Sequence, residues 1–294
     1  MVQLVQLRSR IKAIETIKKI THAMRLISMS THSRLKHKEE PLRTYKLTIL
    51  ALFNKLKKRA PDWHDPIFSP SLSEPNNLII LMGSSKGLCG SFNTALFNHF
   101  NLYLKENSID LSTTTIVTVG KRAHSYIIEH KLGKKIIPLE ELTSATLNPI
   151  SHKLTEIIVK NPQPYSSVMV FSNFLKSFFI QKPETTVLVP LNQVNEKSLK
   201  IQQEEEGADN HSLEEYRWEQ QPEDILEILV KQCLDAYLQH LLFQSLLAEH
   251  ASRFLSMDNS TRNAQNLLEK TKLDYNKLRQ TKITKELSEL LGSY

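Results

Sequence analysis

A glycine-rich turn is the first place to look for chemistry in this chain. Residues 83–91 read GSSKGLCGS and follow an apolar run typical of a buried strand. Backbone amides at such a strand-to-helix turn can bind anions. The turn lacks the order G-x-x-x-x-G-K followed by serine or threonine, and no G-x-G-x-x-G is present. Cys89 has no histidine or acid that the sequence assigns as its activating base. We therefore interpret Gly87, Cys89 and Gly90 as a structural turn that holds no ligand.

Cysteine usage and apolar runs argue against several protein classes. The two cysteines, Cys89 and Cys233, lie far apart in different predicted elements. This pattern predicts neither a disulfide framework nor a metal site, and no cofactor is expected. The 294 residues contain no run of 18 apolar side chains and no hydrophobic secretory signal at the start. The helical pattern begins at once, which leaves no room for a transit peptide and favours a bacterial cytoplasm.

Both ends of the chain are built for helix. Five of the seven glycines lie between residues 83 and 133, so residues 3–57 and 222–291 lack the usual helix breakers. Unbroken helices of these lengths extend about 80 and 100 Å. The sequence therefore predicts that the two ends pair as a long antiparallel coiled coil, a shaft that carries whatever domain lies between them.

The first helix carries an apolar stripe with steps of three and four residues, formed by Leu7, Ile11, Ile14, Ile17, Ile20, Met24 and Ile27. The stripe thins after Ile27, where serine, threonine and histidine dominate. Pro41 is expected to kink or break the helix, with residues 42–56 resuming it.

The last helix is expected to begin at Pro222, followed by acids in its first turn. Its apolar first half is expected to pack on the middle of the chain and on the partner helix. Further on, a narrow seam suited to a two-stranded coil is formed by Ala264, Leu268, Thr271, Tyr275 and Leu278. An apolar tip before Gly292, which a partner is expected to enclose, consists of Leu287, Leu290 and Leu291.

The middle of the chain alternates strands and helices. Strands are expected at 78–82, 114–119, 135–137 and 168–172, with helices at 92–105, 121–130 and 149–160. Residues 178–181 and 186–189 are expected to form a hairpin about Lys182-Pro183-Glu184. The fold class is thus a Rossmann-like α/β domain of about five strands plus a long antiparallel coiled coil. The expected division is 1–60 helix, 75–192 α/β domain, 193–221 acidic loop or insert, and 222–294 helix.

Positive charge is concentrated at the start of the chain. Residues 1–60 contain 15 Lys or Arg and 3 Glu, an excess of 15 − 3 = +12, so the rest of the chain sums to +7 − 12 = −5. Such a helix suits nucleic acid, an anionic membrane surface or acidic protein loops, or is simply a solvated face. No aromatic residues for base stacking lie among the basic residues from Arg8 to Lys38, and no Trp or Phe precedes Phe53.

Several motifs together resemble one known family. Residues 251–264 read ASRFLSMDNSTRNA, and Tyr275-Asn276, Arg279-Gln280 and Ile283-Thr284 follow. Residues 20–24 read ITHAM, and residues 84–93 read SSKGLCGSFN. These motifs resemble the gamma subunit of F-type ATP synthase, the central rotor stalk, over nearly the whole chain. Ser85 stands where that family favours an acid and Ser91 where it favours glycine, so the chain resembles a divergent member.

The resemblance implies a subunit without catalytic residues of its own. Its coiled coil would lie inside the ring of alpha and beta subunits, and its domain would rest with the epsilon subunit on the membrane c-ring. Rotation driven by proton or sodium flow would change the nucleotide affinity of each catalytic subunit in turn. The implied location is the cytoplasmic face of the bacterial inner membrane, as a peripheral protein held through the complex only.

The resemblance also implies roles for single residues. Met24, Arg25 and Arg253 are expected on the shaft surface facing the catalytic ring, with Gln280 as a polar contact further along. Met24 suits the core of the coil equally well. The apolar tip of Leu287, Leu290 and Leu291 is expected in an apolar sleeve. Tyr216 and Glu219 are expected near the epsilon subunit and the c-ring, or else anchor a loop.

Two other classes of protein are alternatives to the hypothesis that the chain is a rotor subunit. One is a coiled-coil nucleic-acid-binding or scaffold protein with a basic helix, whose nucleic-acid binding weakens steeply with salt. The other is an α/β nucleotide-binding enzyme with helical arms, which requires saturable binding near Gly87. The rotor hypothesis instead predicts that the chain binds the alpha, beta and epsilon subunits and the c-ring, and that it binds no nucleic acid.

Overall fold

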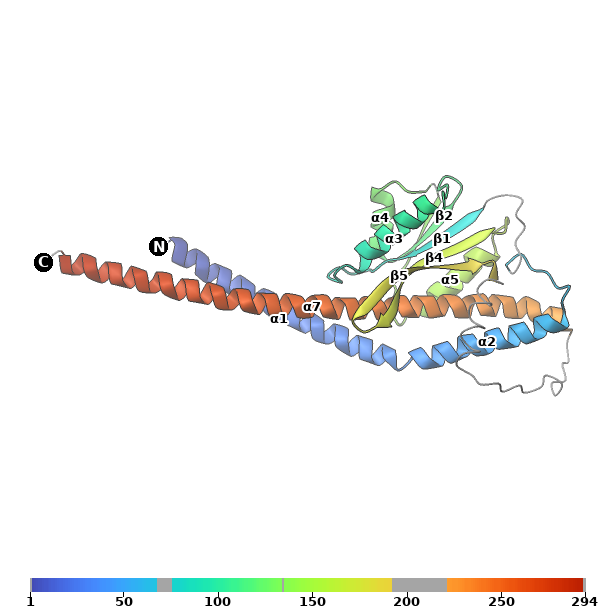
Figure 1. The fold of residues 1–294 in the computed structure, drawn as a ribbon, viewed down its shortest axis with the longest axis horizontal. Helices are drawn as coiled ribbons and strands as arrows, with labels where there is room; N and C mark the ends of the chain where they lie inside the picture. Colours follow the sequence, from blue (N-terminus) through green and yellow to red (C-terminus); the bar gives the residue numbers. More distant parts are fainter. Residues whose placement is uncertain (1, 68–75, 134, 192–220, 293–294) are drawn as a thin grey trace.

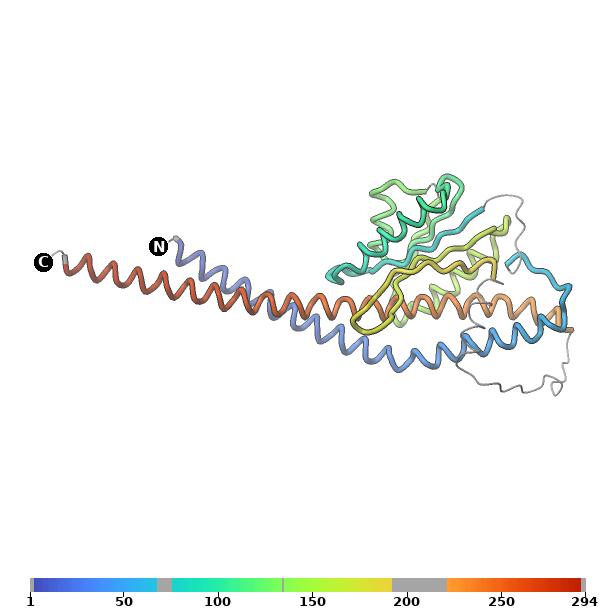
Figure 2. The backbone as a smooth tube through the Cα atoms, in the orientation of Figure 1, coloured from blue at the N-terminus to red at the C-terminus, as the bar shows by residue number. Residues whose placement is uncertain are grey.

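The structure, a computed structural model, describes residues 2–67, 76–133, 135–191 and 221–292. Its long axis is formed by α1 (Val2–Lys36), α2 (Glu39–Arg59) and α7 (Pro222–Gly292). Both chain ends lie at the same end of this axis, where α7 continues beyond the start of α1, and an α/β domain sits towards the other end (Figures 1 and 2). The predicted antiparallel shaft with a central α/β domain is confirmed.

The first helix is interrupted four residues before the predicted position. α1 ends at Lys36 and α2 begins at Glu39, so Pro41 lies in the first turn of α2. A proline removes the hydrogen bond to the carbonyl four residues earlier and clashes with it, so the helix must open upstream, at His37, and not at the proline itself. The Lys38 amide donates to the Leu35 carbonyl at 2.8 Å and closes the end of α1.

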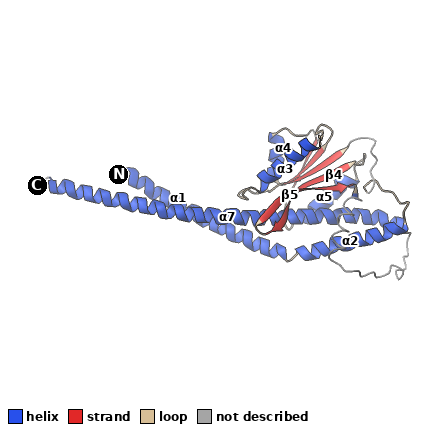
Figure 3. Cartoon of the chain, viewed as in Figure 1, coloured by secondary structure: helices blue, strands red, loops and turns tan. Residues whose placement is uncertain are grey.

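The domain contains one five-stranded sheet in the order β3-β2-β1-β4-β5. Its strands are drawn red in Figure 3. The strands are β1 (Asn77–Met82), β2 (Thr115–Val119), β3 (Lys135–Leu139), β4 (Ser167–Ser177) and β5 (Ile180–Val189). All pairings are parallel except that between β4 and β5. The helices are α3 (Phe92–Glu106), α4 (Lys121–Glu129) and α5 (Leu147–Val159).

Alternating side chains of β1 separate two cores. Ile79 and Leu81 face α3 and α4, where they pack with Phe100 and Ile127. Leu78, Ile80 and Met82 face the other side, where they join one large core with α2, α5 and the first half of α7. The shaft is therefore not attached to the domain by a linker, because α7 itself covers one face of the sheet.

The predicted hairpin is present, but the turn predicted at residues 182–184 is wrong. The chain reverses between Ser177 and Ile180, and Pro183 lies inside β5, opposite Asn173 of β4. β5 is the edge strand of the sheet, so a proline without a donor group is tolerated there. Because proline commonly marks turns, the sequence pattern pointed to the wrong residues.

Candidate functional site

The middle of the shaft has a polar seam. On α1, half-buried or buried residues recur at heptad spacing, at Leu7, Ile11, Ile14, Lys18, Thr21, Arg25, Ser28, His32 and Leu35. Apolar residues hold the two ends of this seam, and five polar residues occupy its middle. The buried positions on α7 include Ala264, Leu268 and Thr271, as predicted from their spacing. Of the other two residues predicted for this seam, Tyr275 is half-buried and Leu278 is 38% exposed.

The apolar stripe predicted for α1 does not follow this seam. Ile17, Ile20 and Ile27 are 53%, 54% and 64% exposed. The stripe steps by three residues twice after Ile14, which is less than the average of 3.5 that a seam requires, so it winds away from α7. Met24, predicted either as a contact residue or as core, is half-buried at the side of the seam.

Three pairs of polar residues join the helices in this region, and we call them the polar band. The Lys18 ammonium group donates to the side-chain oxygen of Gln265. The Thr261 hydroxyl donates to the Thr21 hydroxyl at 2.9 Å. Arg25 pairs with Asp258 at 2.6 Å. The hydrogen bond from Arg25 is the main reason that the pKa of the Asp258 carboxyl is lowered, with Arg262 adding to the effect.

Arg253 does not lie on the outer surface of the shaft, where the sequence placed it. Its side chain is 7% exposed and pairs with Glu249, which is 9% exposed. The guanidinium group also donates to the carbonyls of Lys86 at 3.3 Å and Gly87 at 3.4 Å. One helical turn of α7 therefore binds the glycine-rich turn of the domain, and the Arg253 side chain extends toward the domain.

Ser252 completes this contact by donating to the Cys89 carbonyl at 2.8 Å. We call the contact of Glu249, Ser252 and Arg253 with the carbonyls of residues 86, 87 and 89 the joint. Burial raises the pKa of the Glu249 carboxyl, although the positive charge of Arg253 opposes the shift. Sequence reasoning missed Ser252, because a serine next to an arginine in a helix carries no signal of a distant carbonyl.

The glycine-rich turn has a backbone that few residues tolerate. Gly90 has φ of +57° and Leu88, which is not a glycine, has φ of +63°. Asn93, at the start of α3, fixes the turn by accepting from the Ser84 amide at 3.0 Å and donating to the Ser84 hydroxyl at 2.8 Å. Cys89 is buried among these groups. The side chains of Ser84 and Asn93 are thus engaged within the turn, whereas the buried Ser85 hydroxyl has no hydrogen-bond partner among the described residues.

A second contact ties the β4–β5 hairpin to the shaft. His32 of α1 is 6% exposed, and its ring meets that of Phe178 edge-on with centroids 5.0 Å apart. Its Nδ1 lies 3.3 Å from the Leu247 carbonyl of α7. Burial lowers the pKa of this imidazole. Phe178 also contacts Phe254 of α7, with ring centroids 5.2 Å apart.

The far end of the shaft exposes apolar side chains. Leu287, Leu290 and Leu291 are 55%, 65% and 80% exposed, and Gln280 is exposed before them. Leu278 and Thr281, on either side of Gln280, line a groove with Gln3 and Leu4 at the start of α1. The last turns of α7 continue past the start of α1 (Figure 1). Tyr216 and Glu219 lie outside the described residues.

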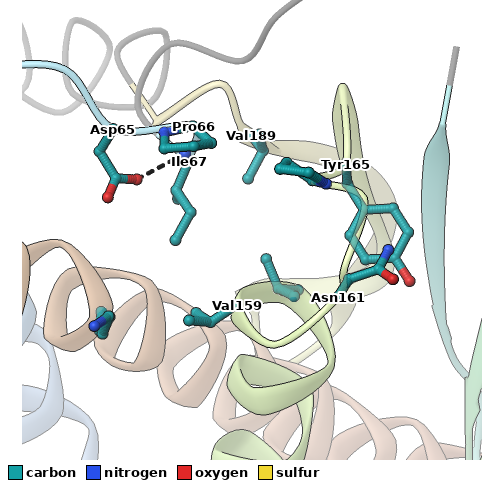
Figure 4. Close-up of a pocket in the computed structure, with 10 residues that line it drawn as sticks. Asp65, Pro66, Ile67, Val159, Asn161, Tyr165 and Val189 are labelled. Atoms are coloured by element: carbon teal, nitrogen blue, oxygen red, sulfur yellow. Dashed lines mark hydrogen bonds between the residues drawn. The ribbon is translucent and has the colours of Figure 1, made fainter. Parts of the chain in front are cut away.

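A cavity of about 110 Å³ lies under the domain, at the edge where β1 and β4 begin (Figure 4). It is lined mainly by apolar side chains such as Ile67, Val159 and Val189, and the Asp65 carboxylate beside it accepts from the Ile67 amide at 2.8 Å. Ligand pockets usually measure about 300 Å³ or more. The cavity lies where β1 and β4 begin, whereas the glycine-rich turn follows the last residue of β1, so the two do not form one nucleotide site.

In the described part of the chain, no three His, Cys, Asp or Glu side chains gather as they would around a metal ion. None of the helices described combines the length and the apolar character needed to cross a membrane.

Comparisons with known proteins agree on one family. A family model described as ATP synthase matches residues 3–294. The chain is 26% identical to the ATP synthase gamma chain of Pelagibacter ubique (strain HTCC1062), covering 99% of this chain and 98% of the relative. It is 27% identical to that of Chloroherpeton thalassium (strain ATCC 35110 / GB-78), covering 99% and 97%.

Solved structures share the fold. One is the central stalk and c-ring of the Tetrahymena thermophila mitochondrial ATP synthase, with a TM-score of 0.54, 20% identity, and 82% of this chain and 98% of that chain covered. Another is a mitochondrial ATP synthase of Euglena gracilis, comprising OSCP, F1 and c-ring in rotational state 3, with a TM-score of 0.53, 18% identity, and 92% and 94% covered.

Proposed function

The chain belongs to the gamma-chain family of ATP synthase, and we propose that it is the rotor of the central stalk in an F-type enzyme. The observation that carries this proposal is α7, a single helix of 71 residues. Its first half is part of the core of the α/β domain, and its second half forms the shaft with α1. A torque applied to the domain therefore reaches the shaft through one continuous element and through the joint.

The proposed action is mechanical. The domain is turned by ion flow through a membrane ring, and the shaft then presents a different side to each catalytic subunit. Differential contact energy between rotor angles changes nucleotide affinity in those subunits, while this chain supplies no catalytic residue. Exposed basic residues of α1 such as Arg8, Lys12 and Lys19 suit this role. Ion pairs formed by exposed side chains are weak. These basic residues therefore attract acidic loops of the catalytic subunits without fixing the rotor at one angle.

The proposed contacts follow the exposure of the residues. Met24 and Gln280 face the catalytic ring, and Arg25 contributes through whatever part of its side chain the pair with Asp258 leaves accessible. The tip of Leu287, Leu290 and Leu291 enters an apolar sleeve formed by the alpha and beta subunits, which removes its apolar surface from water. Tyr216 and Glu219 are proposed to contact the epsilon subunit and the c-ring.

The proposed location follows from these partners. The chain is held at the cytoplasmic face of the bacterial inner membrane as a peripheral subunit. α1 and the second half of α7 meet the catalytic ring, and the domain, whose core includes α2 and the first half of α7, meets the parts at the membrane.

Co-purification tests the function. A tagged full-length chain expressed in its own host is expected to bring down alpha, beta and epsilon subunits and the c-ring, and its removal is expected to abolish ion transport coupled to ATP hydrolysis in membranes. Recovery of the chain alone, or with nucleic acid that dissociates as salt is raised, would contradict the rotor assignment and favour the basic-helix alternative.

A further inference from the structure

The β4–β5 hairpin is longer than the sheet to which it belongs. β1 pairs with β4 only from Ser167 to Phe171, whereas β4 and β5 continue as a pair to the turn between Ser177 and Ile180. Residues 172–184 therefore form a two-stranded segment beyond β1, which we call the hairpin extension. Two strands alone are at best marginally stable in water, so this extension needs support from outside the sheet.

The shaft supplies that support. Leu175 is 8% exposed and belongs to the large core that α7 shares with the sheet. Phe178, at the tip, contacts the ring of His32 on α1 and the ring of Phe254 on α7, with centroids 5.0 and 5.2 Å apart. In Figure 1 the yellow hairpin reaches the shaft with this tip. Phe179, the next residue, is 74% exposed, so only one of the two rings at the tip packs on the shaft.

The contact at the tip reaches α1 without passing through α7. Within the described residues, the hydrogen bonds and ion pairs that α1 makes with other elements go to α7 and to the start of α2. His32 is 6% exposed, and its ring contact with Phe178 adds a direct connection to the hairpin. The helix is interrupted five residues later, at His37, so α2 does not continue α1 as one rigid rod.

We propose that the hairpin extension is a brace between the domain and α1, with His32 and Phe178 as its positioning residues. Turning the domain then moves α1 directly, as well as through α7 and the joint, a consequence that rests on the proposed rotor function. Without the brace, α1 follows the domain only through its packing on α7 and across the interruption at His37.

The brace requires a neutral imidazole at His32. Burial is the main reason that the pKa of this group is lowered from 6.5; the Leu247 carbonyl and Glu39 oppose the shift, and Lys36 adds to it. On α7 the nearby titratable group is His250, whose pKa burial lowers to about 4, and the hairpin presents an uncharged ring. Undocking of the hairpin returns the imidazole to water, where its pKa is higher. The brace is therefore expected to weaken as the pH falls below 6.5.

Hydrogen exchange in the full-length chain, read by mass spectrometry, tests the brace. Phe178→Ala removes the packed ring and is expected to speed exchange in residues 172–184 by about tenfold. The same variant is expected to speed exchange in residues 26–36 of α1 several-fold, although no residue of α1 has changed. The matched control, Phe179→Ala, removes the exposed ring of the same turn and is expected to change neither segment.

Faster exchange in the hairpin extension alone would overturn the proposal, because the hairpin would then rest on the shaft without holding α1. Unchanged exchange in both segments would overturn it as well. If Phe178→Ala loses helical circular dichroism, Phe178→Leu replaces it, since leucine stays apolar but lacks the ring that meets His32. The same two outcomes are then decisive.

A pH profile separates the positioning role of His32 from simple packing. After correction for the intrinsic rate, exchange of both segments in the parent chain is expected to speed up several-fold from about pH 7 to about pH 5.5. His32→Phe keeps an aromatic ring at this position and cannot bind a proton, so its profile is expected to be flatter. His240 and His250 remain in this variant and account for any general effect of acid. Equal profiles in the variant and the parent would refute the role of His32.

The purpose of the brace is tested in the assembled enzyme. Phe178→Ala is expected to lower ion transport relative to ATP hydrolysis, and an unchanged ratio would refute the transfer of torque through the hairpin. The exchange measurements use the chain alone, so they decide whether the brace exists whatever the result of the co-purification.

Discussion

Replacing Arg253 by methionine tests whether the joint holds the shaft to the domain. Methionine keeps much of the apolar length of the side chain and removes the charge. The Glu249 carboxylate, 9% exposed, then remains buried without its cation, and the carbonyls of Lys86 and Gly87 lose a donor. Removal of one partner of a buried pair costs about 3–5 kcal/mol.

Urea unfolding followed by circular dichroism measures this loss. With a denaturant dependence of about 3 kcal/mol per molar, the midpoint is expected to fall by about 1 M or more. The control is Arg262→Met on the same helix, whose guanidinium group is 76% exposed beside Asp258. An exposed pair contributes at most about 1 kcal/mol, so the control midpoint should move little.

The same variant has a predicted pH dependence. Burial already places the pKa of Glu249 above its unfolded value, and loss of Arg253 removes the effect that opposes this shift. The folded state then binds a proton at a pH where the unfolded state does not, so stability falls as pH rises through that window. The penalty of Arg253→Met is therefore expected to be smaller at pH 5 than at pH 8.

A double variant decides whether the reasoning about burial is correct. Glu249→Met combined with Arg253→Met leaves no uncompensated charge and is expected to recover much of the loss. A single variant within about 1 kcal/mol of the parent, or a double variant no better than the single, would refute the account of the joint.

Three further outcomes follow from the backbone and from buried groups. Gly90→Ala should cost about 1–2 kcal/mol in urea unfolding, because its φ is +57°, whereas Gly87→Ala, which meets only the flexible end of Arg122, should cost less than about 0.5 kcal/mol. Burial lowers the pKa of both His240 and His250 to about 4, so the unfolded state binds more protons below pH 6.5. Thermal stability should therefore fall from pH 6.5 to 4, and a flat profile would contradict this burial. Burial raises the pKa of Cys233 to about 12, so a thiol reagent should modify it only at the rate of unfolding, and rapid modification of the folded chain would count against the packing of α2 on α7.

The sequence predicted most of the elements because their signals are local. Scarce glycine identified the two long helices, and apolar runs bounded by turn residues identified the strands. The helix break predicted near Pro41 is present, whereas the turn predicted at Pro183 is wrong, because a proline restricts its own backbone and does not decide which neighbouring residue opens the helix or reverses the chain. The break fell upstream of the first, and the second was accommodated at a sheet edge.

The sequence by itself determined that two helical ends must pair around an α/β middle, because composition and periodicity fix element type and apolar content. Only the tertiary structure decided which side of α1 faces α7 and that Arg253 points into the domain. Both involve partners distant in the chain: Arg25 and Thr21 of α1 meet Asp258 and Thr261 of α7, and the carbonyls of the glycine-rich turn receive the guanidinium group of Arg253. Hydrogen bonds between such distant groups leave no period in the sequence, since they are specified by geometry that exists only after the elements have packed.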